Sequence, residues 1–126
     1  MRVPEIQSYR FGCIVIDGVT FTKDLIILPD RVIENWWRQE GHALHPGDLA
    51  EIVDLSAPAV ASSEIQPQVL IVGQGAYGRM RVTPETQHAL QAAGTLLIAQ
   101  PTEEACQTYN RLRERQTVVA ALHLTC

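Results

Sequence analysis

The residue types best suited to chemistry lie near the carboxyl end of the chain, where two residues separate His123 from Cys126. An imidazole beside a thiol can lower the pKa of that thiol and give a nucleophilic thiolate. Such a pair also needs a third group that orients the imidazole, and the sequence identifies none. His123 and Cys126 are therefore candidate catalytic residues. The alternative is a buried tail in which His123 has a structural hydrogen bond.

A second motif follows an apolar run at residues 69–72. Residues 73–78 read Gly-Gln-Gly-Ala-Tyr-Gly and match the G-x-G-x-x-G pattern of dinucleotide-binding proteins. In those proteins a helix begins inside the motif, and an acidic residue ends the next strand. Here the first helix-start signal is Thr83-Pro84, and the next strand ends near Gln100 without an acid. The motif therefore predicts no nucleotide cofactor, and we expect no cofactor of any kind.

What remains is a glycine loop at the carboxyl end of a buried strand. Two interpretations stay open, because exposed N–H groups there can hold an anion and glycines also permit a tight turn against neighbouring strands. Open α/β sheets bind ligands where strand ends meet. The loop, the helix start at Thr102 and the chain end would then line one crevice. The candidate ligand-binding residues are Gly73, Gln74, Gly75, Thr102 and Thr125.

A loop containing glycine and proline carries His42, His45 and Asp48. This spacing is not specific for a metal site, and we predict none. Asp48 is more simply the N-cap of a short helix that would end at Leu55. The neighbouring Trp36 and Trp37 predict one core ring and one partly exposed ring, which would form an apolar patch for a protein partner.

The elements that must position these residues differ between the two halves of the chain. Asp17-Gly18 is typical of a two-residue hairpin turn between strands. The expected strands are 9–16, 19–23, 24–28, 32–38, 69–72, 95–99 and 117–124, with helices at 84–93 and 102–115 and loops at 39–47 and 56–66. Strands and helices alternate in the second half. The pattern predicts one three-layer α/β domain over residues 1–126, with a central mixed β-sheet flanked by helices and an N-terminal antiparallel β layer.

Composition excludes several classes of protein. Of the 126 residues, 46% are hydrophobic and 19% are charged, with a net charge of -4, which argues against binding of nucleic acid or an anionic membrane. Three cysteines without close spacing favour a reducing cytoplasm. No apolar run approaches the roughly 18 residues of a membrane helix, and the N-terminus lacks an apolar signal core. The bias of arginine over lysine fits a bacterial chain.

An ordered set of short motifs runs through nearly the whole chain. They are Tyr9-x-Phe11-Gly12, Ile16-Asp17-Gly18, Asp24 at a strand start, Trp37, Gly41-His42, Asp48, Val69 to Gly75, Thr102-x-x-Ala105, Tyr109-Asn110 and the closing His123-Leu124-Thr125-Cys126. This set resembles a family of small α/β domains first described from a methanogen protein of unknown function. That family includes an adipogenesis-associated protein and a mitochondrial respiratory complex I assembly factor.

The resemblance implies a three-layer α/β fold and no known catalytic activity. The family's strand-end loop usually reads Gly-Thr-Gly, and Gln74 replaces the threonine here. We therefore expect a non-enzymatic binding or assembly-factor-like module with an unknown protein partner, acting as a monomer or weak homodimer. The alternative is a small-molecule or anion-binding domain, in which any enzymatic activity would use the Gly73–Gly75 loop and the His123–Cys126 tail.

Overall fold

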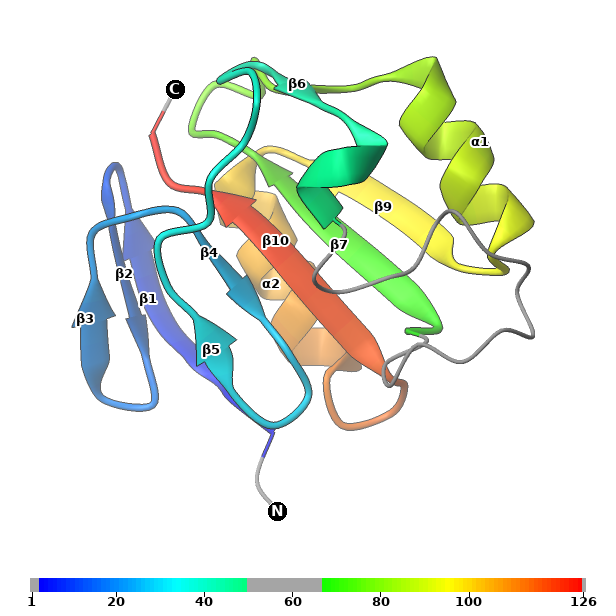
Figure 1. Ribbon diagram of the computed structural model, residues 1–126. Coiled ribbons are helices and arrows are strands. Elements are labelled where there is room, and N and C mark those ends of the chain that lie inside the picture. Colours follow the sequence, from blue (N-terminus) through cyan, green and yellow to red (C-terminus); the bar gives the residue numbers. More distant parts are fainter. Residues whose placement is uncertain (1–2, 50–66, 126) are drawn as a thin grey trace.

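The centre of the protein is a five-stranded mixed sheet in the order β5-β4-β10-β7-β9, seen in the computed structural model, which describes residues 3–49 and 67–125 (Figure 1). β10, β7 and β9 run parallel to one another. β4 pairs antiparallel with β10, and β5 pairs antiparallel with β4. Their bounds are β4 Leu25–Ile27, β5 Val32–Ile33, β7 Val69–Gln74, β9 Leu96–Gln100 and β10 Val118–His123. The predicted α/β class with a mixed central sheet is confirmed.

The N-terminal layer is an antiparallel sheet of β1 (Ile6–Arg10), β2 (Cys13–Ile16) and β3 (Val19–Phe21). The single strand predicted over 9–16 is wrong, because a turn at Phe11-Gly12 divides it. Gly12 has a φ of 74°, which a continuous strand does not allow. The predicted Asp17-Gly18 hairpin turn is confirmed, with φ angles of 48° and 81°.

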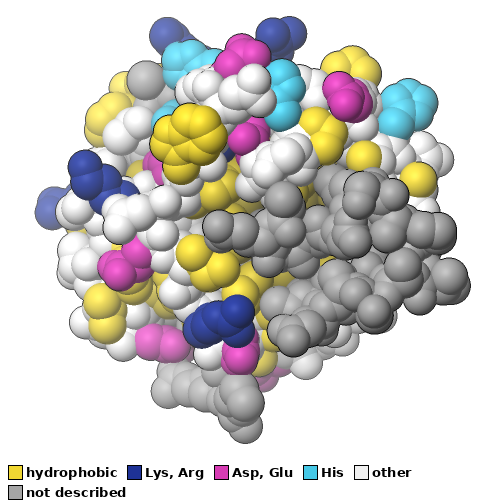
Figure 2. All heavy atoms as spheres, in the orientation of Figure 1, with side chains coloured by type: hydrophobic (Ala, Val, Ile, Leu, Met, Phe, Trp, Pro, Cys, Tyr) yellow, Lys and Arg dark blue, Asp and Glu magenta, His cyan; other side chains and the backbone are white. Residues whose placement is uncertain are grey.

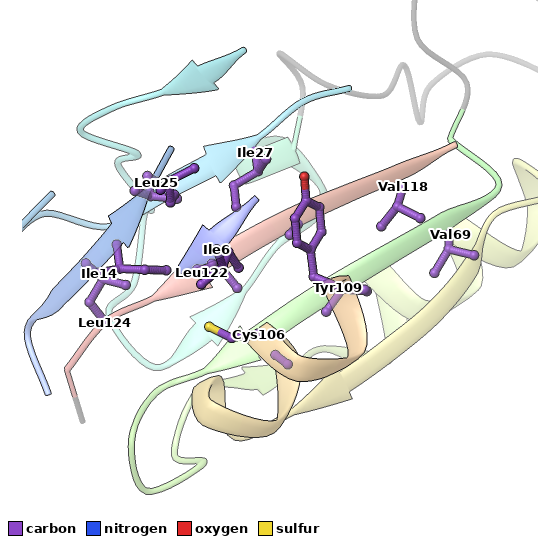
Figure 3. Packing of buried hydrophobic residues seen from close by; sticks show 14 residues of the cluster. Ile6, Ile14, Leu25, Ile27, Val69, Cys106, Tyr109, Val118, Leu122 and Leu124 are labelled. Carbon is purple, nitrogen blue, oxygen red and sulfur yellow. The ribbon is translucent and has the colours of Figure 1, made fainter. Parts of the chain in front are cut away.

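Alternate residues of the central strands supply two cores on opposite faces of the sheet. Side chains such as Val72 and Val119 face α1 (Pro84–Ala92), whereas Ile71 and Ala120 face α2 (Thr102–Leu112) and the N-terminal sheet. Figure 3 shows how residues of the second core meet between α2 and the strands. This double burial explains why the central strands read as continuous apolar runs.

The predicted N-terminal cap is confirmed for α1 but not for α2. Thr83 caps α1 as predicted, because its hydroxyl accepts the N–H of Thr86 at 3.2 Å and Pro84 follows it. The predicted cap of α2 is wrong, since Pro101 is its N-cap and Thr102 is already helical. No helix within the two described ranges is long and apolar enough to cross a membrane.

Short elements complete the face that α1 covers. β6 (Ala43–Leu44) and β8 (Arg81–Val82) form a parallel pair, and a 3-10 helix, η1, spans Pro46–Leu49. The helix predicted to begin at Asp48 therefore begins at Pro46. Its continuation to Leu55 and the loop predicted over 56–66 lie outside the described residues. The strand predicted over 32–38 ends after Ile33, because Asn35 adopts a φ of 56° that breaks extended geometry.

Cys106 belongs to α2, and its side chain is buried in the core that this helix covers (Figure 3). Burial, aided by the nearby Glu103 carboxylate, raises the pKa of its thiol to about 12. We expect the native Cys106 thiol to react with iodoacetamide at neutral pH far more slowly than the same thiol in urea, because the thiolate is the reactive form. Peptide mass spectrometry after timed alkylation measures both rates. Equal rates in the two conditions would contradict the buried position.

Candidate functional site

The loop after β7 and the chain segment after β10 lie side by side at one end of the sheet (Figure 1). Ala76 donates its N–H to the carbonyl of Thr125 at 2.7 Å, and Gly12 donates to the carbonyl of Leu124 at 2.8 Å. The segment is therefore held between the β1–β2 turn and the glycine loop. The structure brings Thr125 to the glycine loop, while Cys126 lies outside the described residues.

Thr102 occupies the centre of this arrangement and is fully buried. Its hydroxyl accepts the N–H of Gly75 at 2.9 Å and donates to the carbonyl of His123 at 2.6 Å. Because the Thr102 hydroxyl already forms these two hydrogen bonds, it does not cap α2. The hydroxyl that was expected to face a ligand instead links α2 to the ends of β7 and β10.

Gly73 allows the close approach of β7 to Thr102. A Cβ atom at this position would lie 2.9 Å from both Thr102 Oγ1 and Leu122 Cδ2. We expect Gly73→Ala to lower the free energy of unfolding by about 1–3 kcal/mol, since overpacking forces neighbouring groups apart. Urea denaturation measures the loss. Gly47→Ala is the matched control, because a Cβ atom at Gly47 would meet nothing within 4 Å, and equal losses in both variants would contradict the argument.

The other groups of the glycine loop are also engaged within the chain. The Gln74 amide donates to the carbonyl of Met80 at 3.0 Å. Gly78 donates its N–H to the carbonyl of Gly75 at 3.1 Å, while the N–H groups of Gly75 and Ala76 are used as described above. An anion at this loop would have to compete with these bonds. The geometry favours the tight-turn interpretation of the glycines.

The imidazole of His123 has a different set of partners. Its Nδ1 lies 2.8 Å from Asp24 Oδ2, and the same oxygen accepts from Arg38 Nη1 at 2.8 Å. Asp24 Oδ1 accepts the N–H of Leu124, also at 2.8 Å. The side chains of Arg38 and His123 are 6% and 9% exposed. We call these three residues the Asp24–Arg38–His123 cluster, and Asp24 is the orienting group that the sequence did not identify.

The charge state of Asp24 determines which nitrogen of the His123 imidazole carries a hydrogen. Burial by itself would raise the pKa of Asp24, but the hydrogen bonds from His123, the Leu124 N–H and Arg38 outweigh it and lower that pKa. The ionised carboxylate only accepts, so Nδ1 of His123 carries a hydrogen and donates it. His123 Nε2 faces away from Asp24. Both this atom and Arg38 Nε are buried without a hydrogen-bond partner.

The surroundings of the cluster are aromatic and basic. The guanidinium of Arg38 lies 4.7 Å from the ring centroid of Trp36, and its Nη2 donates to the carbonyl of Gly41 at 3.2 Å. The His42 ring approaches His123 edge-on, with 6.1 Å between centroids. The predicted division of the tryptophans holds, since Trp36 is buried and Trp37 is exposed.

The remaining loop residues have structural partners. His45 Nε2 lies 2.8 Å from a carboxylate oxygen of Glu40. The Asp48 carboxylate accepts the N–H groups of Gln39 and His45, at 3.0 and 2.8 Å, so it orders the preceding loop rather than capping the predicted helix. Within residues 3–49 and 67–125 no group of three or more His, Cys, Asp or Glu side chains is arranged to hold a metal.

The protein is thus a three-layer α/β domain whose closing strand ends in a buried acid–base cluster. The chain belongs to the family of proteins of unknown function DUF498/DUF598, whose model matches residues 6–123.

Solved structures of the same fold come from distant organisms. A conserved hypothetical protein of Pyrococcus horikoshii OT3 is 28% identical with a TM-score of 0.75, over 97% of this chain and 99% of that one. A Bordetella parapertussis protein is 27% identical with a TM-score of 0.74, over 97% and 96%. A Bordetella pertussis protein, described as a Mth938-like domain, is 27% identical with a TM-score of 0.64, over 96% and 85%. The predicted resemblance to a family of small α/β domains of unknown function is confirmed by the family match and by this Mth938-like neighbour.

Proposed function

We propose that this chain is a non-enzymatic binding module that holds a protein partner. The observation that carries the proposal is the exposure of three aromatic rings, with Phe11 at 55%, Trp37 at 77% and Tyr77 at 67%. Large aromatic side chains supply much contact area for little lost conformational freedom, and they often anchor protein interfaces. We propose that Phe11, Trp37 and Tyr77 together form one binding surface, which we call the aromatic surface.

Two of these rings contact each other. The ring centroids of Phe11 and Tyr77 are 6.1 Å apart, and the guanidinium of Arg79 lies 5.7 Å from the Tyr77 centroid. Phe11 belongs to the β1–β2 turn and Tyr77 to the glycine loop, so the pair joins the two loops that hold the segment after β10. Figure 2 shows hydrophobic, basic, acidic and histidine side chains on the upper part of the molecule, where these strand ends lie.

Rigid backbone supports each ring. Gly12, next to Phe11, bonds to Leu124, and Ala76, next to Tyr77, bonds to Thr125. Arg38, next to Trp37, is fixed by its ion pair with Asp24. Anchors on a fixed backbone lose less entropy when they bind, so these bonds favour binding at the aromatic surface.

The expected cellular setting follows from composition and resemblance. The proposed module acts in the cytoplasm of a bacterium, where its partner would be another protein rather than nucleic acid or lipid. Resemblance to a complex I assembly factor supports an assembly role, and resemblance to an adipogenesis-associated protein is equally compatible with a non-catalytic role.

Site-specific photo-crosslinking in the native host tests the proposal. A photoreactive phenylalanine analogue at Tyr77 should give a discrete adduct with another protein. The adduct should disappear when Phe11 and Trp37 are both replaced by serine. The same analogue at Val19, which is exposed on β3, is the control and should give no such adduct. Failure to obtain an adduct from position 77, or the same adduct from position 19, would refute a partner at the aromatic surface.

A small-molecule site is the second candidate, and the unpartnered His123 Nε2 favours it. A buried polar nitrogen without a partner costs about 1–3 kcal/mol, and a ligand that forms a hydrogen bond with it would remove this cost. The ligand would sit beside His123 and the Gly73–Gly75 loop. Diethyl pyrocarbonate, which acylates accessible imidazole nitrogen, probes this opening. His88, which is exposed on α1, is the reference. Modification of His123 at a rate comparable to that of His88 would support a ligand route, whereas complete protection of His123 would argue against it.

A further inference from the structure

β9 is an open edge of the central sheet. Among the strands of residues 3–49 and 67–125 its only hydrogen-bonded neighbour is β7, and Figure 1 shows it at the margin of the sheet. β10 and β4 are buried at every residue, but β9 is exposed or half-buried along its whole length, with Leu96 60% exposed. This edge therefore combines unpaired backbone groups with accessible apolar side chains.

The usual protections of an edge strand are missing from β9. Its sequence is Leu-Leu-Ile-Ala-Gln, without a charge, a proline or a glycine. Its register with β7 is continuous from Leu96 to Gln100, so no bulge turns the edge away. Natural proteins usually blunt such an edge with lysine, proline or a bulge to prevent pairing with another strand. An unprotected edge of this kind is available for a partner strand.

The direction of the free backbone groups follows from one hydrogen bond. Leu96 donates its N–H to the carbonyl of Gln68 at 2.9 Å, so this group points towards β7. Successive peptide groups of a strand alternate in direction. The N–H and C=O groups of Leu97 and Ala99 therefore point outward, to the side on which no strand of the described ranges lies.

We propose that β9 pairs antiparallel with β9 of a second copy of this chain, about a twofold axis at Ile98. In this register Leu97 of each copy lies opposite Ala99 of the other, and each such pair exchanges two N–H···O=C bonds. The axis thus pairs all the outward groups of Leu97 and Ala99. The two five-stranded sheets join into one continuous sheet with a closed, isologous contact.

Two further observations favour a second copy over an unrelated strand. The register sets a large side chain, Leu97, against a small one, Ala99, in both halves of the contact. An open pocket of about 400 Å³ adjoins this position, lined by Gln74, Arg81, Val82, Gln87, Leu97 and Ala99. Residues directly opposite in antiparallel strands share a face of the sheet, so the partner's Leu97 enters this pocket. No carboxylate of β9 opposes its copy, although each chain has a net charge of -4.

Sedimentation equilibrium over a wide range of protein concentration tests the pairing. The wild type should form a reversible dimer. Ala99→Lys places a charge opposite the partner's Leu97, and Ala99→Pro removes an outward N–H without touching the ladder to β7. Each variant should raise the dimer dissociation constant at least about tenfold. Val19→Lys, the same charge change at an exposed position of β3, should leave the dissociation constant unchanged.

Hydrogen exchange gives a second, local measurement. The Leu97 and Ala99 amides should exchange more slowly at high protein concentration than at low concentration, while the amide of Val19 should not respond. The proposal is overturned if the wild type stays monomeric at millimolar concentration, as expected if the edge awaits a foreign strand. A dimer that persists in both Ala99 variants would place the contact elsewhere and equally overturn it. Neither result tests the proposed partner at the aromatic surface, because the crosslinking experiment detects an adduct with a different protein.

Discussion

Replacing Asp24 with alanine is expected to lower the free energy of unfolding by about 3–5 kcal/mol, because removing one partner of a buried ion pair leaves an uncompensated charge. The charge is that of Arg38, whose side chain is 6% exposed. The same replacement removes the acceptor for the Leu124 N–H and for His123 Nδ1. Urea denaturation followed by tryptophan fluorescence measures the loss, and Trp36 lies next to the affected guanidinium.

The matched control is Asp30→Ala. Asp30 forms an ion pair with Arg31, but the two side chains are 42% and 58% exposed. Surface pairs contribute about 0–1 kcal/mol, so this variant should be close to wild type. If Asp24→Ala and Asp30→Ala proved equally mild, the interpretation of Asp24–Arg38–His123 as a buried electrostatic cluster would be wrong.

The Asp24 carboxylate also makes stability depend on pH in a defined direction. Its folded-state pKa is lowered, so its stabilising contribution is present above the unfolded-state pKa of about 3.9 and is lost as pH falls through the folded-state value. Asp24→Asn removes this titration. The stability difference between wild type and Asp24→Asn should be constant above about pH 5 and shrink as the pH falls below about 4. A difference that grew on acidification would contradict the lowered pKa.

Thr102→Val is expected to lower the free energy of unfolding by about 2–5 kcal/mol. The change keeps the shape of the side chain but removes a hydroxyl that satisfies both the Gly75 N–H and the His123 carbonyl. Each buried group left without a partner costs about 1–3 kcal/mol. Thermal or urea unfolding measures the loss. Thr102→Ser restores the hydroxyl and should recover most of the stability. A valine variant as stable as the wild type would contradict the importance of these two hydrogen bonds.

The sequence predicts the central part of the fold well for a physical reason. β7 and β10 are buried on both faces, so their apolar runs are continuous and hard to mistake. Thr83-Pro84 marks the start of α1 through a local bond within the next helical turn. Local chemistry of this kind, like the Asp17-Gly18 turn, is visible in a few adjacent residues.

The sequence predicted only the part of the candidate site that is formed by the ends of neighbouring strands. The sequence placed the glycine loop beside the segment after β10, and Thr125 lies there. It missed the partners of His123, because Asp24 and Arg38 lie 99 and 85 residues away along the chain. The prediction of Thr102 as the cap of α2 was wrong, because its hydroxyl donates to the carbonyl of His123 on β10, far away along the chain. The one available sign was an acidic residue, Asp24, immediately before an apolar strand.

The position of β10 has a consequence for how the protein is made. β10 comes last in sequence among the strands of residues 3–49 and 67–125, yet it is the central strand of the sheet, between β4 and β7. During translation, β4 and β7 emerge from the ribosome without the strand that joins them, and their apolar edges stay unpaired until residues 118–123 appear. The nascent chain can therefore not complete its sheet before residues 118–123 are synthesised. Chaperone protection of these partial chains is the expected cost of this strand order.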